Sequence, residues 1–176
     1  MREVPEPEHT STRSIGSGMT IAAWIIMFAL ATWFFDGFLE QQHNPNQQVS
    51  TRDFDGGREI TLKRNRQGHY VSNGKINGTK VRFLLDTGAT HVSIPEDVAR
   101  QLRLEAGPQQ IVNTANGQIN VFATLLDNIQ IGDIVLNDVR ASINPYMDDE
   151  EILLGMSFLK HLEFTQRGDE LILRQY

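Results

Sequence analysis

FLLDTGAT, residues 83–90, places an acidic residue, Asp86, directly after a run of bulky apolar residues and directly before Thr-Gly. The apolar run favours a buried strand, whose end delivers Asp86 to the edge of the core, where a carboxylate is costly without partners. Gly88 permits a sharp turn, and its amide can donate a hydrogen bond to that carboxylate. A buried, hydrogen-bonded carboxylate on a rigid loop is a plausible catalytic group. A plain Asp-Thr-Gly turn is the alternative from the tripeptide alone.

The composition excludes several classes of chemistry. The chain has 176 residues and a formal net charge of −6. This charge disfavours nucleic-acid binding, which needs clustered Lys and Arg. The chain has no cysteine, so disulfides, thiolate nucleophiles and cysteine-ligated zinc are excluded. We expect no cofactor and no metal.

Downstream of a polar region, the chain is patterned as short strands. Residues 70–76 and 80–85 flank Asn77-Gly78, a strong two-residue hairpin signal because both residue types tolerate positive φ. We expect a closed, mainly β domain over residues 68–176, with one or two short helices. The further strands are expected at 91–94, 111–114, 119–125, 129–131, 135–143, 151–154 and 171–174, and the helices at 95–102, where residues 93–96 resemble a capping box, and 156–161.

The N-terminal third predicts a membrane anchor. Residues 19–35 are apolar and uncharged, and the flanking residues extend this run to a transmembrane helix over 15–39. Arg2 and Arg13 precede it, so the tail 1–14 is expected to be cytoplasmic. A cleaved signal peptide and a buried core helix are the alternatives.

A signal peptide would be cut at Ala29-Leu30-Ala31, although the apolar run continues past that point. Residues 40–67 are rich in Gln, Asn, Asp and Arg, with Pro45 and Gly56-Gly57. They are typical of a polar tether. A first strand at residues 59–62 is possible at the end of this tether.

Two further motifs accompany the Asp86 loop. The sequence Ile152-Leu153-Leu154-Gly155 is similar to the hydrophobic–hydrophobic–Gly element that packs beside the catalytic loop of retropepsin-like aspartic proteases, and FLLDTGAT resembles their active-site signature. Between the two motifs lies a hairpin at 115–118, where retropepsins carry the flap. The arrangement from His69 to Tyr176 also resembles bacterial clan AA aspartic proteases with an N-terminal membrane anchor.

This resemblance implies a retropepsin-like closed acid-protease β-barrel preceded by a single transmembrane helix. It implies an aspartic-type endopeptidase that cleaves peptide or protein substrates, single-pass in a bacterial inner membrane with the protease domain periplasmic or otherwise extracytoplasmic. The implied site residues are catalytic Asp86; loop-supporting Thr87, Gly88, Ala89 and Thr90; flap residues Ala115, Asn116, Gly117 and Gln118; and Leu153, Leu154 and Gly155 of the second element.

The chain contains one Asp-Thr-Gly, so an active site with two carboxylates requires a homodimer with one Asp86 from each chain. Two such carboxylates share one proton. Met156-Ser157 departs from the polar, often basic pair of retroviral enzymes, which bears on the contacts of the dimer. A membrane-tethered, catalytically inactive peptide-binding or assembly domain on the same fold is the alternative function.

Other polar residues give weaker signals. The five histidines lack a metal-binding spacing. His91 adjoins the loop and is expected to be an exposed strand residue. The acidic run 148–151 is expected to be a solvated loop, with a cation site as the alternative.

Overall fold

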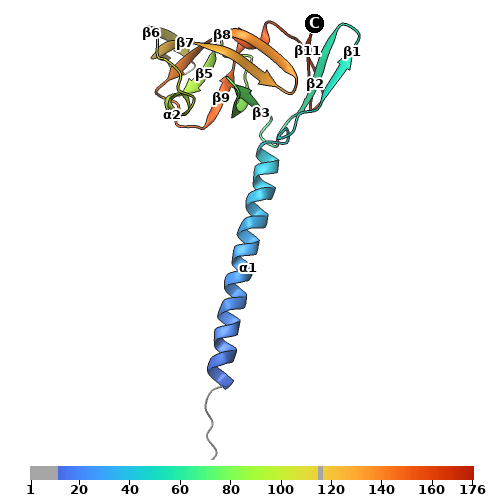
Figure 1. The fold of residues 1–176 in the computed structure, drawn as a ribbon, viewed down its shortest axis with the longest axis vertical. Coiled ribbons are helices and arrows are strands. Elements are labelled where there is room, and N and C mark those ends of the chain that lie inside the picture. Colours follow the sequence, from blue (N-terminus) through green and yellow to red (C-terminus); the bar gives the residue numbers. More distant parts are fainter. Residues whose placement is uncertain (1–11, 115–116) are drawn as a thin grey trace, which may run out of the picture. The chain divides into compact units, whose positions relative to one another are not determined.

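The computed structural model describes residues 12–114 and 117–176 (Figure 1). The expected flap residues Ala115 and Asn116, and most of the expected cytoplasmic tail, lie outside the described residues. The chain divides into two compact units, Met1–Glu40 and Gln41–Tyr176.

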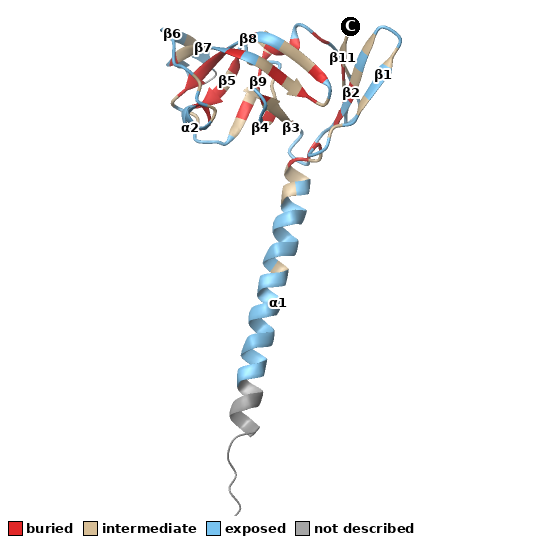
Figure 2. Ribbon diagram, in the orientation of Figure 1, coloured by how far each residue is buried: buried red, intermediate tan, exposed pale blue. Residues whose placement is uncertain are grey.

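Helix α1 (Thr12–His43) makes up the described part of the first unit and ends just inside the second. Its segment Gly18–His43 is, by length and composition, apolar enough to cross a membrane, and a signal sequence passes the same test. Figure 2 shows this helix almost entirely in the colour of exposed residues, so it is not a core helix of the described chain. Its large apolar side chains, including Trp24 and Trp33, are exposed.

The second unit is mainly β, as predicted. Its larger sheet has seven strands, and because β3 also pairs with β7, the sheet closes on itself. Buried residues, drawn red in Figure 2, concentrate in this sheet. In spatial order the strands are β3 (Tyr70–Ile76), β4 (Thr79–Leu85), β9 (Glu151–Leu154), β5 (Val92–Pro95), β8 (Ile134–Asn144), β7 (Gly117–Ile131) and β6 (Gln109–Thr114).

The hairpin between β3 and β4 is the predicted one. Asn77 and Gly78 have φ of 50° and 80°, which matches a turn with positive φ at both central residues. Two short helices, α2 (Glu96–Gln101) and α3 (Met156–Leu159), pack on the sheet. The expected capping box is wrong: Pro95 caps α2 without a side-chain hydrogen bond, because Ser93 lies within β5.

A second sheet of four strands incorporates residues that the polar composition had assigned to the tether. Its strands, in order, are β1 (Thr51–Phe54), β2 (Gly57–Lys63), β11 (Glu170–Gln175) and β10 (Glu163–Arg167). Ile60 and Leu62 of β2 are buried in the core, whereas Glu59 on the opposite face binds Arg174 of β11 at 2.7 Å. The tether prediction overlooked this alternation, because its polar residues occupy the outer face of a strand.

The segment before β1 is also part of the fold. Asn44 and Asn46 are buried. The Asn46 side chain donates to the carbonyl oxygens of Lys63 (2.9 Å) and Val71 (2.7 Å), and it accepts from the Lys63 amide (2.7 Å). Asn44 donates to the side-chain oxygen of Asn73 at 2.8 Å. The described fold therefore begins well before the expected boundary at residue 68, because these amide groups satisfy buried backbone atoms.

Candidate active site

Asp86 lies immediately after β4, where parallel strand β9 runs beside it. Leu84 pairs in register with Leu153, and Leu85 with Leu154. The pairing continues past the end of β4, because the Asp86 amide donates to the Leu154 carbonyl at 3.2 Å. Two neighbouring strands thus fix the backbone position of Asp86.

The turn after Asp86 orients its carboxylate. The Gly88 amide donates to Asp86 Oδ1 at 2.8 Å, as predicted, and the Ala89 amide donates to the Asp86 carbonyl at 3.2 Å. Asp86 is half-buried, whereas Thr87 and Gly88 are exposed. The carboxylate is therefore held at the surface by its own loop, with room for a ligand or for another chain.

Gly155 allows the second element to lie against this loop. A Cβ atom at Gly155 would be 2.6 Å from the Ala89 carbonyl oxygen and still closer to that of His91. Just beyond the glycine, the Met156 amide donates to the Ala89 carbonyl at 2.8 Å. The structure thus brings Gly155 together with the backbone of Ala89 and His91, and this close approach of backbones requires a glycine at this position.

Ser157 joins three segments around the loop, a role that the sequence patterns did not predict. Its amide donates to the Thr90 carbonyl at 2.9 Å. Its hydroxyl accepts from the Val92 amide (2.9 Å) and donates to the Arg140 carbonyl (2.9 Å). The sequence marked Ser157 only as a departure from retroviral enzymes, and no local signal predicts bonds to residues so distant along the chain.

The expected flap is a hairpin between β6 and β7. Thr114 pairs with Gly117, whose φ of 117° suits glycine. The Thr114 hydroxyl donates to the Gly117 carbonyl at 2.8 Å. Within the described residues, no hydrogen bond joins Gly117 or Gln118 to the Asp86 loop. The hairpin and the loop therefore remain separate features of the single chain.

Apolar side chains lie beside Asp86. Leu84 and Leu153 are partly exposed and adjacent across β4 and β9.

Two cavities lie elsewhere on the domain. Exposed His91 lines a cavity of about 890 Å³, together with Arg140 and the segment 103–108. A second cavity, of about 560 Å³, surrounds the β3–β4 hairpin, and neither cavity is lined by Asp86.

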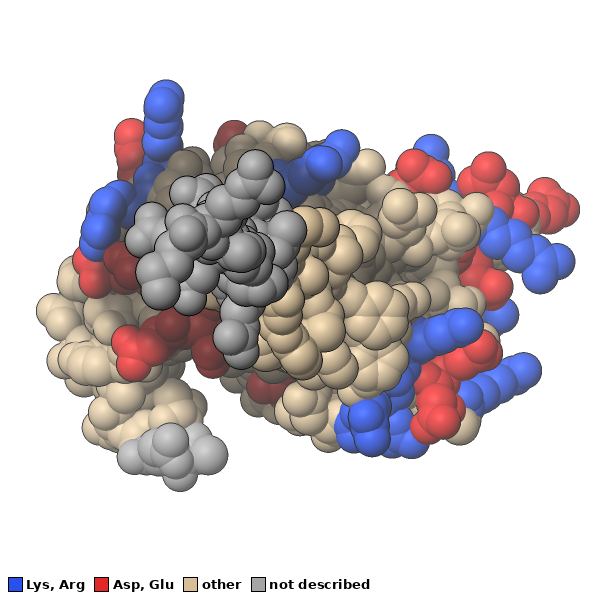
Figure 3. Space-filling model, turned by 90° about the horizontal axis from the view of Figure 1, so that it is seen from below, with Lys and Arg blue, Asp and Glu red and all other residues tan. Residues whose placement is uncertain are grey.

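Several charged side chains of the described chain form ion pairs. Among the described residues, no group of three His, Asp or Glu side chains is placed to hold a metal ion. Glu151, at the end of the acidic run, instead contacts His43 and lies 3.8 Å from Arg82. On the face drawn in Figure 3, basic and acidic side chains are interspersed rather than gathered into one basic area.

Raised pKa values occur on the four-stranded sheet, away from this site. The pKa of Arg174 is raised, chiefly by its hydrogen bond to the Glu59 carboxylate. The pKa of Tyr176 is raised because its hydroxyl donates to Glu163. Both contacts help to join the strands of that sheet.

Comparison with known proteins agrees with this geometry. Residues 72–161 match the family model described as "gag-polyprotein putative aspartyl protease". The chain is 30% identical to an uncharacterised protein from the cobV 5′ region of Sinorhizobium sp., over 93% of this chain and 76% of that protein. It is 26% identical to an uncharacterised protein, RP867, of Rickettsia prowazekii (strain Madrid E), over 67% of this chain and 52% of that protein.

A solved structure supports the same assignment. The crystal structure of a retropepsin-like aspartic protease from Rickettsia conorii matches with a TM-score of 0.55 and 27% identity, over 73% of this chain and 95% of that one. The fold described above and the position of its Asp-Thr-Gly loop agree with this match. The chain therefore belongs to the family of retropepsin-like aspartic proteases.

Proposed function

We propose that this protein is a membrane-anchored aspartic endopeptidase that hydrolyses peptide bonds as a homodimer, with one Asp86 from each chain. The observation that carries the proposal is the half-buried Asp86 carboxylate at the end of β4, which accepts a hydrogen bond from the Gly88 amide. Gly155 and Ser157 support the loop from behind. A domain that only binds peptides has no need for a carboxylate held in this way.

The chemistry requires two carboxylates. At a separation of about 3 Å they share one proton. The ionised carboxylate removes a proton from a water molecule while the water oxygen attacks the scissile carbonyl carbon, and the protonated carboxyl donates its proton to the carbonyl oxygen. The resulting tetrahedral intermediate collapses as a proton passes to the amide nitrogen and the C–N bond breaks, which yields a carboxylic acid and an amine.

The other proposed site residues have supporting roles. Thr87 is exposed next to Asp86, and we assign it to hydrogen bonds across the two-fold axis. The hairpin that includes Gly117 and Gln118 is assigned to closure over an extended peptide, which excludes water. Leu84 and Leu153 offer an apolar surface for a substrate side chain next to the carboxylates.

The proposed anchor is helix α1. Its apolar segment fits a single span, and Arg2 and Arg13 on its N-terminal side favour a cytoplasmic N-terminus. The protease domain is then extracytoplasmic, at a bacterial inner membrane. Two chains confined to one membrane meet at a raised effective concentration, which favours the dimer.

A mixing experiment tests both activity and dimerisation. The full chain in detergent is incubated with a diverse peptide mixture across acidic to neutral pH, and the cleavage products are mapped by mass spectrometry. The wild type is expected to cleave and Asp86→Asn to be inactive. An equal amount of Asp86→Asn should reduce the wild-type rate to roughly half, since half of the wild-type chains then pair with an inactive partner.

Other results would change the assignment. If wild type and Asp86→Asn are equally inactive while both are folded and dimeric, and both bind peptides, the peptide-binding domain becomes the better description. If Asp86→Asn does not affect the wild-type rate after the subunits have exchanged, the shared dyad is wrong.

A further inference from the structure

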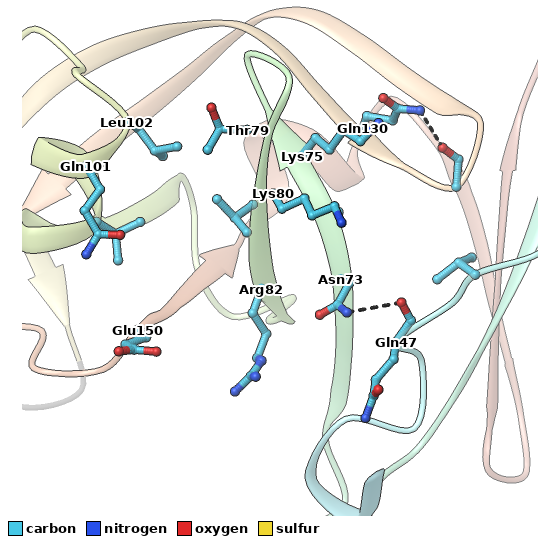
Figure 4. Close-up of a pocket in the computed structure, with 15 residues that line it drawn as sticks. Gln47, Asn73, Lys75, Thr79, Lys80, Arg82, Gln101, Leu102, Gln130 and Glu150 are labelled. Atoms are coloured by element: carbon cyan, nitrogen blue, oxygen red, sulfur yellow. Dashed lines mark hydrogen bonds between the residues drawn. The ribbon is translucent and has the colours of Figure 1, made fainter. Parts of the chain in front are cut away.

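Three cationic side chains lie on one face of the β3–β4 hairpin. Lys75 of β3 is directly opposite Lys80 of β4, and Asn73 is opposite Arg82. Because alternate residues of a strand share a face, all four side chains project from the same side. Figure 4 shows them on the two neighbouring strands. Like charges placed directly opposite each other across a strand pair destabilise the pair unless an anion is present.

The three cations of this face differ in their partners. Arg82 has Glu151 at 3.8 Å. Among the described residues, no ion pair joins Lys75 or Lys80 to a carboxylate. These two lysines therefore retain an unneutralised, repulsive arrangement in the folded chain.

The face borders a cavity of about 560 Å³, which we call the lysine groove. It is lined by Lys75, Lys80 and Arg82, by amide side chains and by apolar side chains such as Val98 and Leu102. Among the described residues, Glu150 is its one acidic lining residue. Figure 4 shows Glu150 and Gln101 on the opposite side of β4 from Asn73. A ligand with negative charges and an apolar part suits this lining.

The groove also contains an open strand edge. β4 pairs with β3 along its whole length, but β9 begins with Glu151 opposite Arg82. In the described chain, residues 79–81 thus have no strand on their second side, and all three line the groove. Exposed backbone amide and carbonyl groups at such an edge can pair with an extended polypeptide.

The same strand leads from the groove to Asp86. Lys80 precedes Asp86 by six residues, which is about 20 Å of extended strand. Because β9 occupies the edge from Arg82 onward, backbone pairing is confined to residues 79–81. Beyond them, an extended peptide would lie across the face that carries Lys80, Arg82 and Leu84, and it would span the distance with about six of its own residues. The groove is therefore within reach of a substrate whose scissile bond is at the carboxylate.

From these observations, we infer that the lysine groove binds an acidic segment of the polypeptide substrate, about six residues from the bond that is cut. This inference rests on the proposed function and specifies its substrate class. The open backbone edge and the direct line to Asp86 favour a peptide over a phospholipid headgroup, which shares only the negative charge.

A binding experiment tests the groove separately from catalysis. The full chain carrying Asp86→Asn, in detergent micelles, is titrated into a rhodamine-labelled extended peptide that contains four glutamates, and into its twin with four glutamines. Fluorescence anisotropy at low salt measures both affinities. The glutamate peptide should bind roughly tenfold more tightly than its twin, and added salt should reduce this preference.

Matched variants locate the site. Lys75→Gln with Lys80→Gln should abolish the preference, whereas Lys63→Gln with Arg167→Gln removes the same charge from the four-stranded sheet and should preserve it. Lys75→Glu with Lys80→Glu should reverse the preference towards a lysine-containing peptide, a result that misfolding does not produce.

Three results would overturn the inference: equal binding of the two peptides, a preference that survives Lys75→Gln with Lys80→Gln, or an equal loss in the control variant. If Lys75→Gln with Lys80→Gln loses binding to phosphatidylglycerol vesicles but keeps its binding to the glutamate peptide, the groove is assigned to lipid instead. Because Asp86→Asn is used throughout, the binding test does not depend on catalysis. A negative binding result leaves the endopeptidase proposal intact, and a negative cleavage assay leaves binding to the groove measurable.

Discussion

The hydroxyl of Ser157 accepts a hydrogen bond from the amide of Val92, the second residue after the Asp86 loop, at 2.9 Å. The same hydroxyl donates to the Arg140 carbonyl of β8 at 2.9 Å, and the Ser157 amide donates to the Thr90 carbonyl. One side chain thus fixes the point where the loop enters β5. We regard Ser157 as a positioning residue for Asp86.

Ser157→Ala should therefore lower kcat more than it raises KM. The substitution leaves the buried Val92 amide without its acceptor, at a cost of about 1–3 kcal/mol in the free energy of unfolding. Steady-state kinetics and thermal unfolding check these two effects. Ser157→Thr retains the hydroxyl and should recover most of the activity. An alanine variant that is less stable yet has an unchanged kcat would show a merely structural role.

Gly155→Ala should destabilise the protein by roughly 3 kcal/mol or more, since the added methyl overlaps two backbone carbonyl groups that cannot move independently. Gly88→Ala is the matched comparison. Its Cβ would meet only Asp86 Oδ1, at 3.2 Å, so its unfolding free energy should change by less than about 1 kcal/mol. Chemical denaturation of both variants measures the difference. Equal losses would mean that close approach at Gly155 is not the constraint.

The features that the sequence predicts well depend on neighbouring residues. Asn77-Gly78 specifies the β3–β4 hairpin because positive φ at two consecutive positions is a local requirement. The hydrogen bond from Gly88 to Asp86 spans only two residues. The loop and the strands around it could therefore be derived from the order of residues along the chain.

The features that the sequence does not predict depend on distant partners. β10 has a single large apolar residue, Phe164, so it lacks the alternation that marks a half-buried strand. The bonds of Ser157 and Asn46 join segments that are remote in sequence, and polar composition alone does not distinguish a buried asparagine from a solvated one. This is why polar composition alone predicts a tether over residues 40–67.

Asn46→Ala should be strongly destabilising. It removes three hydrogen bonds, which satisfy the carbonyl groups of Lys63 and Val71 and the amide of Lys63. We expect a loss of about 3 kcal/mol or more in the free energy of unfolding, because Asn46 and Val71 are buried and the Val71 carbonyl would lose its partner. Gln48→Ala, at an exposed position of the same segment, should change stability by less than about 0.5 kcal/mol. Equal, small effects in denaturant titrations would restore the view of this segment as a loose tether.

Truncation tests the boundary of the domain more directly. A chain of residues 41–176 retains the buried asparagines and both sheets, and it should unfold in one cooperative transition. A chain of residues 68–176 lacks β2, whose Ile60 and Leu62 are fully buried beside Leu171 and Leu173 of β11. Each lost side chain removes about 1.5–3 kcal/mol of burial, so this fragment should not fold.

An intermediate chain of residues 51–176 separates the two contributions, since it keeps β1 and β2 but lacks Asn44 and Asn46. It should fold with a lower melting temperature than residues 41–176. Circular dichroism and limited proteolysis of the three chains provide the comparison. If residues 68–176 melt cooperatively at the temperature of the longest chain, then β1 and β2 are an appendage and the four-stranded sheet does not stabilise the protease domain.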